Sequence, residues 1–341
     1  MLLRTVEGSE TAVPSVARLQ SKHPGRVGGR SQRAWRALVQ LPRPTASLLL
    51  SVFLGWALSA PQARAQAESS PETAQSSAWR LAKSDPHALV QAAIENELKD
   101  SYGHRAPVRY LLRKKTRNTD TTKEIVETHH GGVARLVANH GQPLTPTQLQ
   151  TELQRLRDLA SNPTAQQHRR HNEERDAGRI AGVMRLLPDA YTNQYQGPVQ
   201  TPGGTVIRLT FSPNPHFSPP TLESRLLTGI QGEIWIDPTD LRVVRIEGHL
   251  FREVEYGWGI LGTLYPGGTI RIDQSKTPEC GWQLARLDLN MTGKELMLKS
   301  LRVVVEEEAT DYHPVPAGWK YSDAIEWLLH MPETLAAESN R

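Results

Sequence analysis

The sequence has almost no cysteine. Cys280 is the only one in 341 residues, so no disulfide can form within the chain. Cys280 also lies far from the N-terminal region, which excludes the acylated cysteine of a bacterial lipoprotein. Its neighbour Glu279 is acidic, whereas a reactive thiol needs an electropositive setting, so we expect Cys280 to be inert. Stability must therefore come from a packed core, which roughly 275 residues can supply in one domain.

The motifs of common enzyme classes are also missing. The sequence contains no Gly-x-Ser-x-Gly elbow, phosphate-binding loop, dinucleotide fingerprint or His-Glu-x-x-His motif. His168 and His171 are spaced for one helix face beside Glu173–Glu174, but a third convergent metal ligand is absent. His129–His130 would point to opposite sides of a strand. We expect no metal site, no cofactor and no catalytic residue, and therefore no enzyme.

Four aspartates could still furnish a carboxylate pair for acid–base chemistry: Asp237, Asp240, Asp273 and Asp288. Asp237 and Asp240 flank Pro238-Thr239, and aspartate is favoured in turns because it hydrogen-bonds to the nearby backbone. We therefore prefer a turn role for these two. A hydrolase with an unrecognised site remains a third alternative, behind the two functions developed below.

Residues 1–65 have the composition of a secretory signal region. The apolar run Leu48–Leu58 follows several arginines and precedes Ala63-Arg64-Ala65, which predicts cleavage between Ala65 and Gln66. At 11 residues the run is too short to span a bilayer, which needs about 20. We expect a periplasmic or exported protein with no transmembrane segment in the mature chain.

Removing this region reverses the sign of the net charge. Residues 1–65 hold nine Lys or Arg and two Asp or Glu, a charge of +7, so the rest of the formal +4 chain carries −3. A nucleic-acid-binding domain would need a basic stripe, which argues against nucleic acid as a partner. We interpret the short charged runs 113–117 and 306–308 as solvated faces.

The predicted mature chain begins with a disordered linker, residues 66–80, rich in Ser, Glu and Gln. A single domain, 81–335, follows. Its first helix covers 88–98, with Ser84 as the predicted cap. Strands are predicted over 108–117, 123–130 and 133–137. Thr145-Pro146-Thr147-Gln148 is a capping box that begins a helix carrying Leu149, Leu153, Leu156 and Leu159. A second helix covers 165–187 and is predicted to end before Pro188.

The C-terminal half is predicted to form antiparallel strands. Residues 205–211 form one strand, and 232–237 and 241–250 alternate around a Pro-Thr-Asp turn as a hairpin. In the second arm Val244, Ile246 and Leu250 share one face. Gly257–Gly262 is a glycine-spaced corner, and 269–274, 282–290 and 295–308 are further strands. The fold class is therefore α+β: a curved antiparallel sheet, an unclosed barrel, covered on one side by amphipathic helices.

The hairpin motif Gly-Glu-Ile-Trp-Ile-Asp237 followed by Leu241-Arg-Val-Val-Arg-Ile-Glu-Gly248 resembles the periplasmic outer-membrane lipoprotein carrier superfamily, the LolA/LolB-like proteins. The matching motif covers about 20 residues. Within that superfamily, this sequence looks most similar to long exported members. The resemblance implies an unclosed barrel lidded by helices, with a hydrophobic cavity that receives acyl chains. It assigns no individual ligand residue.

Two functions follow from these features. The first is an exported carrier-like protein that binds lipid or lipoprotein acyl chains, with possible envelope protein partners. The second is a non-catalytic structural or interaction protein of the envelope whose core is filled by its own side chains. The predicted cavity lining combines the aliphatic face of the sheet with the Leu149 helix as a movable lid. Its residues are Ile234, Ile236, Val244, Ile246, Leu250, Ile270, Ile272, Leu149, Leu153 and Leu156.

Overall fold

The computed structural model describes residues 71–99, 106–256, 262–295 and 299–331. The predicted signal region, its cleavage site and most of the Gly257–Gly262 corner lie outside these residues. The helices are α2 (Pro71–Ser84), α3 (Pro86–Lys99), α4 (Pro146–Ala160), α5 (Pro163–Ala190), the short 3-10 helix η2 (Glu223–Thr228) and α6 (Tyr321–His330). None of these helices is both long enough and apolar enough to cross a membrane.

The strands build one large sheet. They are β1 (Val108–Thr116), β2 (Asp120–Thr128), β3 (Gly131–Asn139), β4 (Gln142–Pro143), β5 (Tyr191–Thr201), β6 (Gly204–Pro213), β7 (Ile230–Asp237), β8 (Arg242–Leu250), β9 (Val254–Tyr256), β10 (Gly262–Leu264), β11 (Thr269–Thr277), β12 (Gly281–Glu295) and β13 (Lys299–Pro314). The order along the sheet is β4-β3-β2-β1-β13-β12-β11-β8-β7-β6-β5, and β10 joins β9 to β12. The pairings between neighbours are antiparallel, and the end strands β4 and β5 do not pair, so the α+β class and the unclosed sheet are confirmed.

Residue alternation divides the central sheet into an apolar face and a charged face. On the charged face one cross-strand row runs from β6 to β1: Arg208, Trp235, Arg245, Asp273, Arg286, Glu308 and Arg113. Opposite charges alternate along much of this row, and the Arg245 guanidinium lies 4.3 Å from the centre of the Trp235 ring. The long strands thus present a water-compatible outer surface while their other face builds the core.

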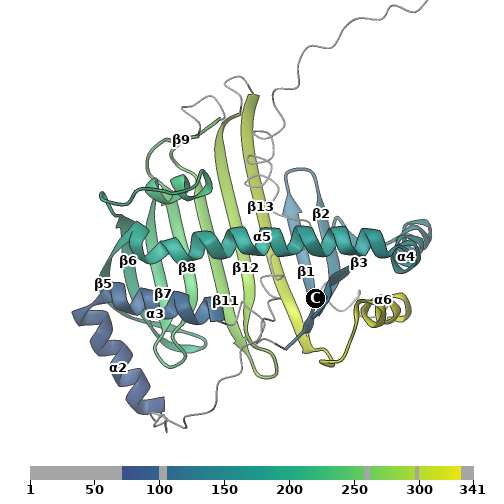
Figure 1. The fold of residues 1–341 in the computed structure, drawn as a ribbon, viewed down its shortest axis with the longest axis horizontal. Helices are drawn as coiled ribbons and strands as arrows, with labels where there is room; N and C mark the ends of the chain where they lie inside the picture. The colour runs from purple at the N-terminus through teal and green to yellow at the C-terminus, as the bar shows by residue number, and fades with distance from the viewer. Residues whose placement is uncertain (1–70, 100–105, 257–261, 296–298, 332–341) are drawn as a thin grey trace, which may run out of the picture.

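The helices lie at the two ends of the sheet, with α2 and α3 near β5–β8 and α4 and α6 beside β3 (Figure 1). Buried residues of α2 and α3 join the main core with β5–β8. At the other end, Leu156 and Leu159 of α4 and Ile325 and Leu328 of α6 pack with Val126 and its neighbours on β1–β3. Val126 adjoins Ile125 in β2, and Ile125 belongs to a separate cluster on the other face. Coverage is therefore divided between the two faces.

Local signals explain where the helices begin. The predicted capping box of α4 is confirmed: Thr145 Oγ1 accepts from Gln148 N, and Gln148 Oε1 accepts from Thr145 N. Asn162 caps α5 by accepting from Ala165 N. The cap of α3 is Asp85, which accepts from Ala88 N, and the prediction of Ser84 is wrong because Ser84 still belongs to α2.

Several sequence predictions need correction. Residues 71–80 are helical rather than a disordered linker, because Ala78 and Ala82 give α2 a small-residue face that is buried in the main core. The edge strand β5 was not predicted. His129–His130 lie in the turn between β2 and β3, not in a strand. Pro188 lies inside the last turn of α5, which continues to Ala190.

Candidate ligand-binding site

A row of aliphatic side chains crosses the apolar face of the sheet. Leu209, Ile234, Ile246, Ile272 and Leu287 are successive register partners on β6, β7, β8, β11 and β12. Neighbouring strands lie about 4.8 Å apart, so this row extends about 19 Å. Leu209, Ile234 and Leu287 are buried, whereas Ile246 and Ile272 are only half-buried. The side chains at both ends of the row are therefore buried, and those in the middle are partly exposed to solvent.

A second row lies beside the first and contains two glycines. It pairs Phe211, Gly232, Gly248, Ile270 and Leu289 in order across the same strands. A methyl group on Gly232 would overlap the backbone of Glu247 and Gly248, so the close approach of β7 and β8 requires glycine here. Ile270 and Leu289 are half-buried against the main core. The accessible patch thus includes Ile246, Ile270, Ile272 and Leu289, which we call the central aliphatic patch.

Helix α5 passes across the sheet over the covered face (Figure 1). Its closest backbone neighbours are α4 and β3 at one end and α3, β5 and η2 at the other, so it is fixed mainly at its ends. Its apolar residues Val183, Met184, Leu186 and Leu187 contact the main core but remain half-buried. By contrast, α3 buries Leu89, Val90, Ala93 and Ile94 against the same core. The sheet is tightly packed under α3 and less completely covered along α5.

The predicted cavity residues separate into three groups. Ile234, Ile236 and Leu250 are buried within the main core and are packed by the chain's own side chains. Ile246, Ile270 and Ile272 form part of the central aliphatic patch. Val244 belongs to neither group. A β-bulge pairs Ile236 with Val243, so Val243 is buried in the core instead of Val244.

The α4 residues do not reach this patch. Leu156 is buried with β1–β3 and α6 on the other face of the sheet, and Leu149 and Leu153 on the same helix are half-buried. The prediction of α4 as the lid is therefore wrong, because helical periodicity identifies an apolar stripe without saying which face of a sheet it will cover. The helix that crosses the central aliphatic patch is α5.

A charged pair adjoins the first aliphatic row. Glu307 on β13 is the register partner of both Leu287 on β12 and Lys114 on β1, so it continues the row by one strand. Lys114 Nζ lies 2.6 Å from Glu307 Oε1, and Glu307 is 2% exposed. The prediction that residues 306–308 form a solvated face is wrong at Glu307. The signal was present in the sequence, because Glu307 continues the alternation of Leu301, Val303 and Val305.

The residues with potential metal or acid–base chemistry do not converge on one site. His168 and His171 are exposed on α5. Glu173 faces inward, where Gly132 N lies 3.4 Å from its Oε2 atom, and burial raises its pKa to about 7. Glu174 instead pairs with Arg170 at 2.8 Å. Within the described ranges, no group of three or more His, Cys, Asp or Glu residues could hold a metal ion.

The four candidate aspartates also have separate structural partners. Asp237 accepts from the backbone of Thr239 and Asp240 in the β7–β8 turn, as the turn interpretation expects. Burial opposes ionisation of Asp240, but hydrogen bonds from Lys276 and Trp282 outweigh it and keep the pKa of Asp240 below its ordinary value. Asp273 pairs with two arginines, Arg245 and Arg271, and Asp288 pairs with Arg286. Each aspartate therefore has a cationic or turn partner.

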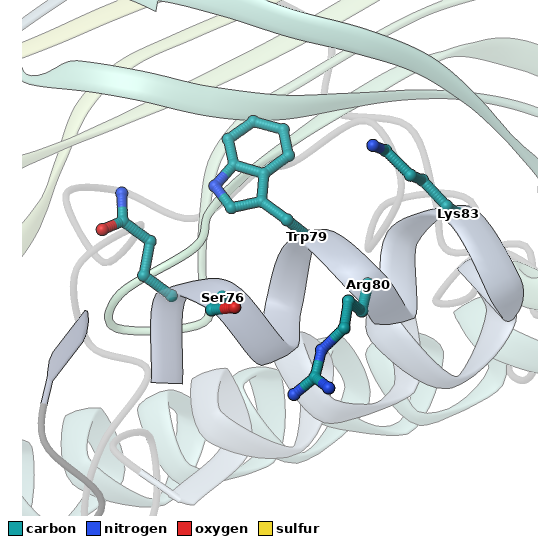
Figure 2. A pocket seen from close by; sticks show the side chains of 5 residues that line it. Ser76, Trp79, Arg80 and Lys83 are labelled. Atoms are coloured by element: carbon teal, nitrogen blue, oxygen red, sulfur yellow. The ribbon is translucent and has the colours of Figure 1, made fainter. Parts of the chain in front are cut away.

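A surface pocket of about 410 Å³ lies along α2, away from the central aliphatic patch. Figure 2 shows Trp79 and Lys83 on the side of α2 that faces a neighbouring strand, with Arg80 directed away from it. The lining residues are Gln75, Ser76, Trp79, Arg80 and Lys83. All come from one helix, and all except Trp79 are exposed, so the pocket has no enclosed polar group that would select a ligand.

Comparison with known proteins gives no family assignment. No family model and no curated protein matches the chain. Among solved structures, it is similar to a domain described as that of an outer membrane lipoprotein-sorting protein from Vibrio parahaemolyticus, with 12% identity, 70% of this chain and 97% of that chain covered, and a TM-score of 0.27. A DUF1329 family protein from Desulfovibrio piger has 8% identity, 71% and 98% coverage, and a TM-score of 0.24.

Proposed function

We propose that this chain is a non-catalytic, carrier-like protein of the cell envelope that holds acyl chains between the curved sheet and α5. The observation that carries the proposal is the central aliphatic patch: Ile246, Ile270, Ile272 and Leu289 remain half-buried on the covered face. The signal-like composition of residues 1–65 supports an exported location. Its partners would be the acyl chains of lipids or lipoproteins, together with envelope proteins that deliver or receive them.

Burial of an acyl chain supplies free energy comparable to the cost of association. Each methylene removed from water contributes about 0.8 kcal/mol, so a chain of about a dozen carbons contributes about 10 kcal/mol against a cost of roughly 4–15 kcal/mol. The ends of α5 are fixed to the rest of the fold, while its middle has fewer close neighbours. A displacement of this middle segment would widen the space over the patch.

The alternative is a structural envelope protein with a self-filled core. One observation favours it: the predicted lining residues Ile234, Ile236 and Leu250 are already buried against the chain's own side chains. The two functions differ in whether the central aliphatic patch accepts a foreign chain. They make opposite predictions for ligand binding by the folded protein.

Binding of a neutral fluorescent acyl probe to the purified, delipidated protein tests the proposal. We expect saturable binding at micromolar protein and displacement by an envelope lipid extract. Folding of the sample is checked in parallel by circular dichroism. Absence of saturable binding in a folded, delipidated sample contradicts the carrier function and favours the structural alternative.

A further inference from the structure

The aliphatic row that ends at Glu307 has an unusual polar terminus. The Glu307 side chain is 1% exposed, and its Oε1 atom receives Lys114 Nζ at 2.6 Å. Its Oε2 atom is also shielded from solvent, but none of the described residues donates a hydrogen bond to it. A carboxylate oxygen can accept more than one hydrogen bond, and burying one without a donor is costly. Glu307 therefore has a buried acceptor that an incoming donor could satisfy.

The position of this acceptor relates it to the central aliphatic patch. Ile246, Ile272, Leu287 and Glu307 are consecutive members of one cross-strand row on β8, β11, β12 and β13. Two strand spacings, about 10 Å, separate Ile272 from Glu307. An acyl chain that lies over Ile246 and Ile272 and displaces the covering of the buried Leu287 would bring its polar head group to Glu307.

The charge at this terminus selects the type of head group. Lys114 neutralises Glu307 through Oε1, so the pair as a whole offers no excess positive charge to an anion. A carboxylate head group would meet the negative Oε2 atom, whereas an N–H or O–H donor would form a charge-assisted hydrogen bond with it. The aliphatic surroundings strengthen this difference, because a buried polar group without a partner is strongly disfavoured.

We propose that Glu307 is the head-group receptor of the site and that it selects single-chain amphiphiles bearing a hydrogen-bond donor, such as an amide N–H or a primary ammonium, over fatty acid anions. This inference rests on the proposed acyl-binding function and names the class of ligand for that same site. Lys114 acts as a positioning residue that holds Oε1 and leaves Oε2 as the acceptor for the ligand.

Competition among three amphiphiles of equal chain length tests the inference. Dodecylamine, dodecanamide and dodecanoate are compared at pH 8 for displacement of the neutral fluorescent acyl probe from the full wild-type protein. Because a hydrogen bond to a charged acceptor is strong, we expect both donor ligands to bind roughly tenfold more tightly than dodecanoate. Equal affinities for all three would overturn the head-group inference while leaving the carrier function intact.

Glu307→Gln provides the matched substitution, since it keeps the side-chain volume and removes the negative charge. We expect the preference for donor ligands to fall to within about threefold, because the substitution removes the negative charge that strengthens a donor's hydrogen bond and opposes the dodecanoate carboxylate. Glu306→Gln is the control: Glu306 is 48% exposed and pairs with Lys115 on the charged face. A Glu307→Gln protein that folds and keeps the full preference overturns the inference.

If Glu307→Gln fails to fold, the relative affinities of the three amphiphiles for the wild-type protein alone test the head-group inference. Failure of the probe itself to bind saturably is a different result, because it contradicts the carrier function and removes this inference with it. Saturable probe binding without discrimination among the head groups contradicts this inference alone.

Discussion

Glu97 on α3 and Arg242 on β8 form a two-point ion pair in the interior. Arg242 Nη2 lies 2.8 Å from Glu97 Oε2, and Arg242 Nε lies 3.0 Å from Glu97 Oε1. Glu97 Oε1 also accepts from Val243 N at 2.9 Å, next to the β-bulge. The Arg242 and Glu97 side chains are only 9% and 8% exposed. The pair therefore fixes α3 on the hairpin and defines the tightly packed end of the covered face.

Breaking this pair should destabilise the fold. Glu97→Ala would leave the Arg242 guanidinium buried without its main counter-ion, and we expect a loss of about 3–5 kcal/mol in the free energy of unfolding. Glu95→Ala on the exposed side of α3 is the control and should change it by less than about 1 kcal/mol. Urea denaturation curves measure both. Similar losses for the two variants would contradict the structural role assigned to Glu97.

Charged substitutions should distinguish the filled core from the central aliphatic patch. Ile236 is fully buried, so Ile236→Lys would bury an unpaired ammonium and should unfold the protein, at a cost of several kcal/mol. Ile272 is half-buried, so Ile272→Lys can extend its ammonium to water. We expect Ile272→Lys to remain folded by circular dichroism and to lose most acyl-probe binding. A folded Ile272→Lys protein with unchanged probe affinity would place the ligand elsewhere.

Stability should fall as the pH rises through neutrality, in part because of Glu124. Burial raises the pKa of Glu124 to about 7, with the Arg109 guanidinium opposing the shift. The folded state then binds more protons than the unfolded state between about pH 4.5 and 7, so stability decreases over this interval. Wild type should lose roughly 2–3 kcal/mol more than Glu124→Gln between pH 5 and pH 8.

Denaturation midpoints at the two pH values measure this difference. Glu247→Gln, on the exposed face of β8, should behave as wild type. The assignment to Glu124 fails if Glu124→Gln keeps the full pH dependence.

The capping box of α4 should contribute measurably to stability. Thr145→Ala removes the hydroxyl that accepts from Gln148 N and should cost about 1 kcal/mol. Thr147→Ala is a matched control in the first turn, since its side chain is exposed and does not form the cap. Thermal unfolding of both variants compares them directly. An equal effect at the two positions would argue against a specific capping contribution.

Local patterns predicted the parts of the fold that depend on neighbouring residues. The β7–β8 hairpin follows from alternation around a Pro-Thr-Asp turn, and α4 begins where its capping box predicts. β5 was missed because residues 191–201 are mostly polar, as an exposed edge strand permits. Val244 was predicted to be buried, but Val243 is buried instead. The β-bulge inserts one extra residue, which reverses the in–out alternation of side chains along β8.

The arrangement of the site depended on long-range packing that local patterns do not encode. The apolar stripe of α4 was visible in the sequence, but its location with α6 on the other face was not. The half-buried state of Ile246 and Ile272 likewise does not follow from strand alternation, which predicts only the face on which they lie. The burial of Glu307 could have been predicted from the sequence, because Glu307 follows Leu301, Val303 and Val305 at the same two-residue spacing.

Native mass spectrometry of the protein purified from its native cells tests the central claim most directly. The account predicts a protein mass accompanied by one or more discrete additional masses of lipid or acylated peptide, which are lost on delipidation and restored by an envelope lipid extract. A folded protein that carries only its own mass, both as purified and after incubation with that extract, would contradict it.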